Sequence, residues 1–458
     1  MVFSSFTFLA LFLPAFLVVY NLIPSHLIRM KNVTLLAFSL FFYTAGEPVW
    51  VLLLIFSGLW DYFIGRFITN VSHQWQARAL LSLSLCGNIG ILFIFKYGTF
   101  TLAQFGMNVS FAATLPIGIS FYTFQSLSYT IDLYRGIITK PQYDPIAFLS
   151  YVSMFPQLVA GPIIRYSDVE EKLTNRHVTA TGFSDGITLF VMGLGKKIIL
   201  ANHAGKIADE LLGAAPEYMS TGGVWLGSLM FMFQIYFDFS GYSNMAIGLG
   251  KMVGFDFKEN FRHPYTAKSI TDFWRRWHIS LSSFFRDYIY IPMGGNRRHQ
   301  ILNLLVVWSV TGLWHGASWN FVLWGLYFGC ILILEKYALK CFLQTAPDLL
   351  TRVYALLIIL FGWVIFYFTD LSVLFEVSTK FFSITETFAD HRAIELFFAN
   401  IWIIPVLALF STTIPIRLFA QLKQRIAITE PVYNAALFSA SIAMLVGQTF
   451  NPFLYFRF

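Results

Sequence analysis

The residue best placed to do chemistry in this sequence is His315, in the stretch Trp314-His315-Gly316-Ala317. It lies near the middle of residues 301–334, which belong to the longest run without Lys, Arg, Asp or Glu. An ionisable side chain at membrane depth is costly when charged, so it is usually retained for a function. A neutral imidazole can take the proton of a hydroxyl group, which makes His315 a candidate general base. The alternative is a neutral histidine that hydrogen-bonds to a neighbouring helix.

The run around His315 is too long to be one straight membrane helix. At a rise of about 1.5 Å per residue, such a helix would greatly exceed the roughly 30 Å of a hydrocarbon core. We therefore expect the run to break, at Thr311-Gly312 and at Gly316.

A second histidine, His278, lies in the most basic part of the chain. Residues 251–300 contain nine Lys or Arg against four Asp or Glu, and such an excess of positive charge is typical of cytoplasmic loops. Within this segment, residues 269–290 are predicted to form an amphipathic helix in the membrane interface, because Trp274, Trp277 and Leu281 recur at helical spacing. The positive residues are Lys251, Lys258, Arg262, Lys268, Arg275, Arg276, Arg286, Arg297 and Arg298.

Two interpretations of this basic segment remain open. In the first, its charges attract lipid headgroups, which requires no substrate. In the second, its cations and the stretch Gly294-Gly295-Asn296 bind the phosphates of a nucleotide-containing donor.

A third polar residue at membrane depth is Asp238, the only charge between Glu217 and Lys251. A carboxylate in such a run must be paired, hydrogen-bonded or protonated. We expect a structural partner, such as a buried arginine. Similar packing roles are expected for Asp132, Arg135 and Arg165.

The composition predicts an all-α, polytopic membrane protein. Of the 458 residues, 57% are hydrophobic and only 12% are charged, about half the charge of a soluble domain. Apolar segments cover roughly 6–23, 33–45, 48–65, 79–95, 113–131, 146–164, 184–200, 223–250, 301–334, 351–368, 397–415 and 434–450. They predict about 11–13 spans and half-spans in a single domain, residues 1–458, with the first run retained as a span. The positive charge lies between apolar segments, which argues against a nucleic-acid partner, and the three cysteines show neither disulfide nor metal spacing.

Several ordered motifs resemble the membrane-bound O-acyltransferase superfamily, most densely over residues 113–335. The similarity is greatest to its bacterial branch for cell-envelope polysaccharides, such as alginate and peptidoglycan. The motifs are Leu115-Pro116-Ile117-Gly118, Phe155-Pro156-Gln157-Leu158-Val159-Ala160-Gly161-Pro162, Tyr236-Phe237-Asp238-Phe239-Ser240-Gly241-Tyr242-Ser243, Trp274-Arg275-Arg276-Trp277-His278, Gly294-Gly295-Asn296-Arg297 and Leu313-Trp314-His315-Gly316-Ala317.

The resemblance implies a helical bundle around a central funnel. It implies that His315 is the catalytic base and that His278 positions the acceptor or stabilises the tetrahedral oxyanion. It further implies acetyl-CoA as the acyl donor, no metal, a polysaccharide as final acceptor, an SGNH-type O-acetyltransferase partner outside the membrane, and residence in the bacterial cytoplasmic membrane. The residues expected to bind the donor are Arg275, Arg276, Asn296, Arg297 and Arg298.

The C-terminal stretch, residues 451–458, is aromatic-rich and contains Tyr455. One interpretation is an aromatic belt at the membrane interface. The other rests on resemblance to the C-terminal motif of envelope acylation systems, in which a tyrosine is a covalent acyl carrier, so Tyr455 is a third candidate catalytic residue.

Three other functions are alternatives to O-acetylation. One is a D-alanyl-type transferase for another envelope polymer, and another is a scaffold for an envelope complex, which would explain neither histidine. The third is a transporter, which would predict an internal repeat, and the sequence shows none.

Overall fold

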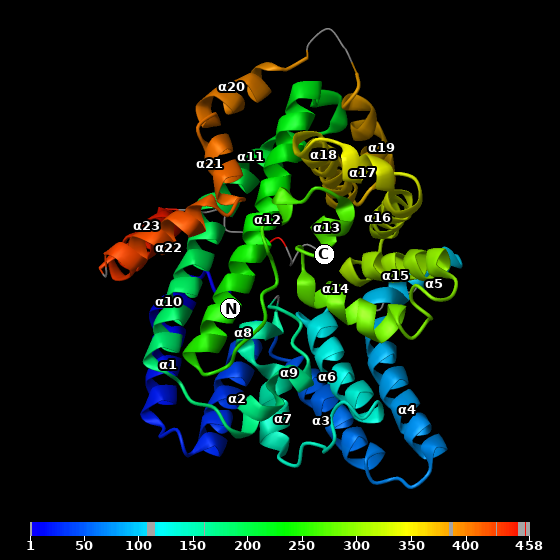
Figure 1. Cartoon of the computed structure of the whole chain (residues 1–458), viewed down its shortest axis with the longest axis vertical. Helices are drawn as coiled ribbons and strands as arrows, with labels where there is room; N and C mark the ends of the chain where they lie inside the picture. The colour runs from blue at the N-terminus through cyan, green and yellow to red at the C-terminus, as the bar shows by residue number, and fades with distance from the viewer. Residues whose placement is uncertain are drawn as a thin grey trace. The chain divides into compact units, whose positions relative to one another are not determined.

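The computed structural model is helical throughout the part of the chain that it describes, which is residues 2–107, 115–159, 161–383, 388–426, 428–447 and 454 (Figure 1). The predicted all-α fold is confirmed. The helices form two compact units, one of Met1–Gly193 and Tyr242–Lys258, the other of Leu194–Gly241 and Glu259–Phe458. The division into two compact units does not test the prediction of a single domain, which stays a prediction.

The first unit consists of apolar helices that are joined in part by polar contacts. In its core, Asp61 is fully buried and accepts hydrogen bonds from Ser84 (2.6 Å), Asn88 (2.8 Å) and Ser126. In a membrane, apolar side chains pack about equally well against a neighbouring helix and against lipid. Polar contacts such as these therefore help to hold neighbouring helices together. Its helices are η1 (Phe8–Phe12), α1 (Leu13–Leu22), α2 (Ile28–Thr44), α3 (Val51–Ile68), α4 (Gln74–Leu92), η2 (Phe93–Tyr97), α5 (Gly98–Gln104), α6 (Ile119–Tyr134), α7 (Pro145–Ser153), α8 (Phe155–Leu158), α9 (Tyr166–Thr174) and most of α10 (Ala180–Gly195).

The second unit holds most of the motifs that could carry chemistry. Its helices are η3 (Lys196–Ala201), α11 (Asn202–Leu212), η4 (Pro216–Tyr218), the first part of α12 (Thr221–Met252), η5 (Pro264–Thr266), α13 (Ile270–Trp274), α14 (Ile279–Phe285), η6 (Arg286–Tyr290), α15 (Gln300–His315), α16 (Trp319–Tyr337), α17 (Lys340–Thr345), α18 (Asp348–Tyr367), α19 (Leu371–Lys380), α20 (His391–Asn400), α21 (Ile403–Phe410), α22 (Ile414–Arg425) and α23 (Thr429–Gly447).

Several helices are long and apolar enough to cross a bilayer. Among the described residues these are Val51–Ile68, Gln74–Gln104, Trp319–Tyr337 and Asp348–Tyr367, and a fifth span results if the pair α20 and α21, bent by 62°, is counted as one. Each predicted apolar segment overlaps at least one helix, but many of these helices are shorter or interrupted. The chain is a multi-pass membrane protein, and the count of 11–13 spans and half-spans stays a prediction.

The charge-free run breaks at one of the two predicted places. Helix α15 ends at His315, Gly316 is extended (φ −172°, ψ 157°), and α16 begins at Trp319, so the predicted break at Gly316 is confirmed. The predicted break at Thr311-Gly312 is wrong, because α15 continues through it. A Cβ atom on Gly312 would lie 2.1 Å from the Phe321 carbonyl oxygen, so this glycine allows α15 and α16 to approach closely.

Candidate active site

His278 lies at a break in the helix that the sequence predicts over residues 269–290. Helix α13 ends at Trp274 and α14 begins at Ile279, so the prediction of one continuous helix is wrong. His278 between them has a left-handed backbone, with φ 45° and ψ 55°. This conformation costs a residue with a side chain about 1–2 kcal/mol, and it persists only where the surrounding contacts enforce it.

The contacts that enforce it come from Asn260, whose side chain is fully buried. The Asn260 carbonyl oxygen accepts the Ile279 N–H at 3.0 Å. Its side-chain Oδ1 accepts the Ser280 N–H at 3.0 Å and the Ser280 hydroxyl at 2.9 Å, and it lies 3.2 Å from His278 Nδ1. Asn260 therefore fixes both the backbone turn and the imidazole.

These bonds favour one position for the imidazole proton. Because a backbone N–H donates to Asn260 Oδ1, that atom is an oxygen, and we assign the proton to His278 Nδ1, which can then donate to it at 3.2 Å. The Ser280 hydroxyl, which also lies 3.4 Å from Nδ1, then donates to Asn260 at 2.9 Å. The turn lies outside the spanning helices, and burial lowers the pKa of His278 to about 3, so the ring is neutral at pH 7. Nε2 then carries a lone pair, and it is buried without a hydrogen-bond partner among the described residues.

This tautomer bears on the role predicted for His278. A neutral ring with its only N–H bonded to Asn260 cannot donate a hydrogen bond to an oxyanion through Nε2. It can accept one from an incoming hydroxyl group. The geometry therefore favours positioning of the acceptor over stabilisation of the oxyanion.

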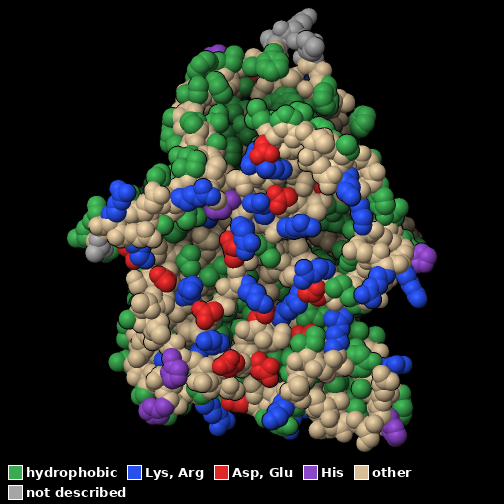
Figure 2. Space-filling view, viewed as in Figure 1, with side chains coloured by type: hydrophobic (Ala, Val, Ile, Leu, Met, Phe, Trp, Pro, Cys, Tyr) green, Lys and Arg blue, Asp and Glu red, His purple; other side chains and the backbone are tan. Residues whose placement is uncertain are grey.

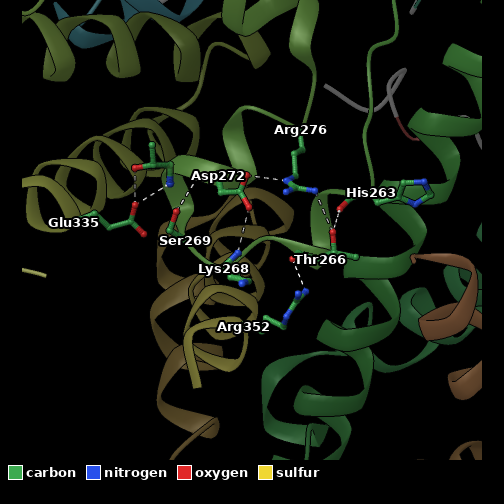
Figure 3. A network of polar contacts seen from close by, with 9 residues as sticks. His263, Thr266, Lys268, Ser269, Asp272, Arg276, Glu335 and Arg352 are labelled. Atoms are coloured by element: carbon green, nitrogen blue, oxygen red, sulfur yellow. Dashed lines mark hydrogen bonds and ion pairs between the residues drawn. The ribbon is translucent and has the colours of Figure 1, made fainter. Parts of the chain in front are cut away.

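A buried carboxylate holds the start of α13. Glu335 of α16 is 4% exposed and accepts the N–H groups of Ile270 (2.6 Å) and Thr271 (2.8 Å), together with the Thr271 hydroxyl (2.6 Å). Ser269 caps the same helix through the Asp272 N–H, at 3.0 Å (Figure 3). A negative charge at a helix N-terminus is stabilised by free N–H groups and by the helix dipole.

Arg276 extends this network toward η5. It lies 2.8 Å from Asp272 and donates to the Thr266 hydroxyl at 3.3 Å, while Arg352 donates to the Thr266 carbonyl oxygen at 2.6 Å (Figure 3). The Arg262 N–H also donates to the Arg276 carbonyl oxygen, at 2.9 Å. The segment on both sides of His278 is thus tied to its neighbours by polar contacts.

A cavity of about 170 Å³ contains both predicted histidines. One wall is a single face of α15, because its lining residues recur at helical spacing from Leu304 to His315. The other wall comes from α13, α14 and η6, and includes His278, Arg286 and Tyr290. The α15 residues are Leu304, Val307, Trp308, Thr311 and His315.

The far end of this cavity is aromatic. The His315 ring packs edge-on against Trp324 (5.0 Å between centroids) and Phe366 (5.1 Å). The indole of Trp314 contacts the rings of both histidines, His315 at 4.9 Å and His278 at 5.9 Å. An apolar site of this kind excludes water and strengthens electrostatic interactions with reacting groups.

Three of the predicted donor-binding residues are free to meet a ligand. Arg275, Arg297 and Arg298 are exposed, and within the described ranges none of them forms an ion pair. On the face shown in Figure 2, Lys and Arg side chains lie among those of Asp and Glu. Arg276, by contrast, already contacts Asp272 and Thr266 in the network described above.

Asn296 shapes the loop that carries Arg297 and Arg298. Its Oδ1 accepts hydrogen bonds from the Tyr290 hydroxyl (2.8 Å) and from Gln300. The buried Asn303 of α15 donates to the carbonyl oxygens of Gly295 (3.0 Å) and Arg298 (2.7 Å). Gly294 and Gly295 have positive φ, at 108° and 54°, as such a turn requires. Asn296 thus fixes the loop at the Tyr290 end of the cavity.

The remaining predicted residues have different outcomes. Tyr455 lies outside the described residues. Asp238 has the buried partner that we expected, but it is Lys197, with Nζ 2.5 Å from Oδ1, and not an arginine. No group of three or more His, Cys, Asp or Glu side chains in the described ranges could hold a metal ion. No sequence pattern singles out Asn260, since a lone polar residue in a basic segment has many possible roles.

Comparisons with known proteins agree with these motifs. Residues 138–378 match the model of the membrane-bound O-acyltransferase family. Over its full length the chain is 38% identical to the full length of a probable alginate O-acetylase of Azotobacter vinelandii. It is 35% identical to a peptidoglycan O-acetyltransferase of Helicobacter pylori, over 72% of this chain and 69% of the relative. A teichoic acid D-alanyltransferase of Streptococcus thermophilus matches at 27% identity over 49% of this chain and 57% of the relative.

The family model and the full-length relative both include the α13–α16 region, in which the two histidines share one apolar cavity. The chain therefore belongs to the membrane-bound O-acyltransferase family and is an O-acyltransferase.

Proposed function

We propose that this enzyme moves an acetyl group from acetyl-CoA, bound on the cytoplasmic side of the bacterial cytoplasmic membrane, toward O-acetylation of an exported or cell-envelope polysaccharide. The names of the relatives at 35–38% identity, an alginate O-acetylase and a peptidoglycan O-acetyltransferase, support an acetyl group and a polysaccharide of one of these two kinds. A D-alanyl group is less well supported, because that relative is less similar and matches about half of the chain.

The observation that carries this proposal is the course of the cavity along α15. From Leu304 to His315 the helix advances about 16 Å, and the cavity follows one face over that distance. The loop with Arg297 and Arg298 lies at the N-terminal end of α15, and the two histidines lie at the other end of the cavity. This layout suits a donor with an anionic nucleotide head and a long arm ending in a thioester.

The chemistry assigned to His315 is general base catalysis. Its imidazole takes the proton of an acceptor hydroxyl as the oxygen attacks the thioester carbonyl carbon. A C–O bond forms, the C–S bond breaks, and the leaving thiolate recovers the proton from the imidazolium. Nε2 of His278 accepts a hydrogen bond from the hydroxyl and orients it before the attack.

We assign Tyr455 as the first acceptor. A cytoplasmic thioester and a polysaccharide outside the membrane do not meet, so an intermediate carrier is needed. An aryl ester on the Tyr455 hydroxyl remains activated and can pass the acetyl group to an SGNH-type transferase outside, which then acylates the polysaccharide.

The test measures hydroxylamine-labile acetate on exported polysaccharide in cells that express each variant. His315→Ala should lower acetylation by about 10² to 10⁴-fold at a normal level of membrane protein. The matched control is His391→Ala, at a histidine whose side chain is 95% exposed. Normal acetylation in His315→Ala would refute its role as the base.

The proposed role of Tyr455 as acyl carrier needs a separate test. Tyr455→Phe keeps the ring and removes the hydroxyl, so it should abolish acetylation, whereas Tyr218→Phe, at a tyrosine that is 76% exposed, should not. Mass spectrometry of the wild-type C-terminal peptide should show an acetyl adduct that hydroxylamine removes. Full activity of Tyr455→Phe would exclude the carrier.

A further inference from the structure

A buried ion pair in the second unit has no role in the chemistry above. Lys197 Nζ lies 2.5 Å from Asp238 Oδ1, and the two side chains are 3% and 4% exposed. Two charges removed from water in this way are stable only when they are paired and their remaining hydrogen-bonding capacity is used. Lys197 belongs to η3, a π-helical segment, and such segments occur frequently at functional sites.

The second oxygen of Asp238 binds the C-terminal part of the chain. Oδ2 accepts the backbone N–H of Leu454 at 2.9 Å, and Leu454 is 4% exposed. Hydrogen bonds to a charged acceptor are about twice as strong as neutral ones. A carboxylate whose charge is already matched by Lys197 thus uses its other oxygen to hold a distant backbone amide.

The helix that precedes Leu454 contacts the element that carries Lys197. Helix α23 packs on the start of η3, where a Cβ atom on Gly195 would lie 2.8 Å from the Leu437 side chain. Both α23 and Leu454 therefore contact the η3–α12 pair of elements. The two contacts hold the C-terminal part of the chain at separate points.

The ion pair is close to the catalytic cavity. The residue after Asp238 is Phe239, whose ring packs edge-on against the His278 imidazole with 4.8 Å between centroids. Leu454 directly precedes Tyr455 in the sequence, the residue proposed above as the acyl carrier.

We propose that the Lys197–Asp238 pair is the docking site for the C-terminal segment and that Asp238 is a positioning residue for the acyl carrier. Asp238 binds the Leu454 amide, which requires no particular side chain, and Lys197 neutralises the carboxylate and fixes its orientation. Docking itself does not depend on the chemistry of Tyr455, but its purpose in catalysis rests on the proposed function.

The test of docking uses full-length protein in nanodiscs, with Cys86, Cys330 and Cys341 replaced by serine and Leu454→Cys as the reporter. This reporter keeps the backbone N–H that Asp238 binds, and the wild-type position is buried. The rate of maleimide labelling should rise by about one to two orders of magnitude when Asp238→Asn is added, as expected for loss of charge from one hydrogen bond to a buried anion. An unchanged labelling rate in folded Asp238→Asn protein would overturn the docking site.

A second arm leaves the ion pair intact, in case Asp238→Asn does not fold. Leu454→Pro removes only the backbone donor, since proline has no N–H, and Leu454→Met keeps both the donor and the side-chain volume. We expect Leu454→Pro to lose polysaccharide acetylation at a normal protein level and Leu454→Met to retain it. Equal acetylation in the two variants would contradict positioning by this amide.

The two proposals can fail separately. Labelling of Leu454→Cys is repeated with Tyr455→Phe, which cannot carry an acyl group but keeps the Leu454 amide. Slow labelling that depends on Asp238 in this background supports docking, even if Tyr455→Phe proves active and excludes the carrier. Fast labelling in every background overturns docking and leaves the carrier to its own test.

Discussion

Replacement of Asn260 should separate the orientation of His278 from its chemistry. Asn260→Leu has a similar volume but removes the Oδ1 acceptor that the His278 Nδ1–H, the Ser280 N–H and the Ser280 hydroxyl all use. The imidazole then loses the contact that fixes its tautomer and ring orientation. The neutral ring can place its proton on Nε2, which removes the lone pair that we propose accepts a hydrogen bond from the acceptor hydroxyl.

The size of the effect follows from these contacts. Loss of a partner that orients a metal-ligating histidine typically lowers activity about 10–100-fold, and we expect a loss of the same order here. That loss should be smaller than the one from His278→Asn, in which the imidazole itself is gone and asparagine still tolerates the left-handed backbone. The orphaned Ser280 N–H also destabilises the protein by about 1–3 kcal/mol, so protein level and thermal stability must be measured.

The assay is a double-mutant cycle on polysaccharide acetylation, normalised to membrane protein. If Asn260 acts through His278, the double variant Asn260→Leu/His278→Asn should be no less active than His278→Asn alone. If the activity losses of the two single variants multiply in the double variant, Asn260 does not act through His278. Full activity of Asn260→Leu would also refute this role.

Asn260→Asp provides a control for which the direction of the pH effect on activity can be predicted. It keeps an acceptor oxygen, but its negative charge raises the pKa of His278 from about 3 toward the ordinary value. Protonation removes the Nε2 lone pair, so this variant should be active at neutral pH and lose activity as pH falls below about 6. The wild type should not show that loss from His278, and a flat profile for Asn260→Asp would contradict the assigned tautomer.

Three further outcomes are expected. The double variant Arg297→Gln/Arg298→Gln should raise KM for acetyl-CoA with little change in kcat, measured against Arg262→Gln, whose cation already pairs with Glu259. Gly312→Val should lower the melting temperature, because its side chain meets the Phe321 carbonyl oxygen and such overpacking costs about 1–3 kcal/mol, whereas Gly90→Ala, with open space, should be tolerated. Glu335→Gln should destabilise the start of α13 by about 1–3 kcal/mol, read as faster hydrogen exchange of the Ile270 and Thr271 amides than in wild type.

The sequence predicted the helical fold well, for physical reasons. Apolar runs identify helices in a membrane protein because every backbone group must be satisfied within its segment. The two histidines stood out because polar side chains are rare in such runs. Gly316 was correctly predicted to end a helix, but Gly312 was not a break, since a glycine can also serve close packing against a neighbouring helix, which no local pattern reveals.

The parts that local patterns missed depend on contacts between distant residues. The aromatic spacing of Trp274, Trp277 and Leu281 is compatible with one helix, yet Asn260 holds the turn at His278 that interrupts it. Likewise, Asp238 had to have a partner, but its identity depends on how α12 and η3 pack. Propensity and periodicity report the preferences of a segment, and tertiary hydrogen bonds override them where a site is built.

The different surroundings of the two histidines favour different chemical roles for them. His278 is 1% exposed, and burial holds its pKa well below the ordinary value, so it is poorly suited to carry the positive charge that a general base acquires. Its fixed tautomer suits it instead to accept a hydrogen bond and orient a hydroxyl group. His315 is only half-buried, at the end of α15, where a cation is favoured by the helix dipole. Transient imidazolium therefore forms at lower cost on His315, and this is the physical reason to place the proton transfer there.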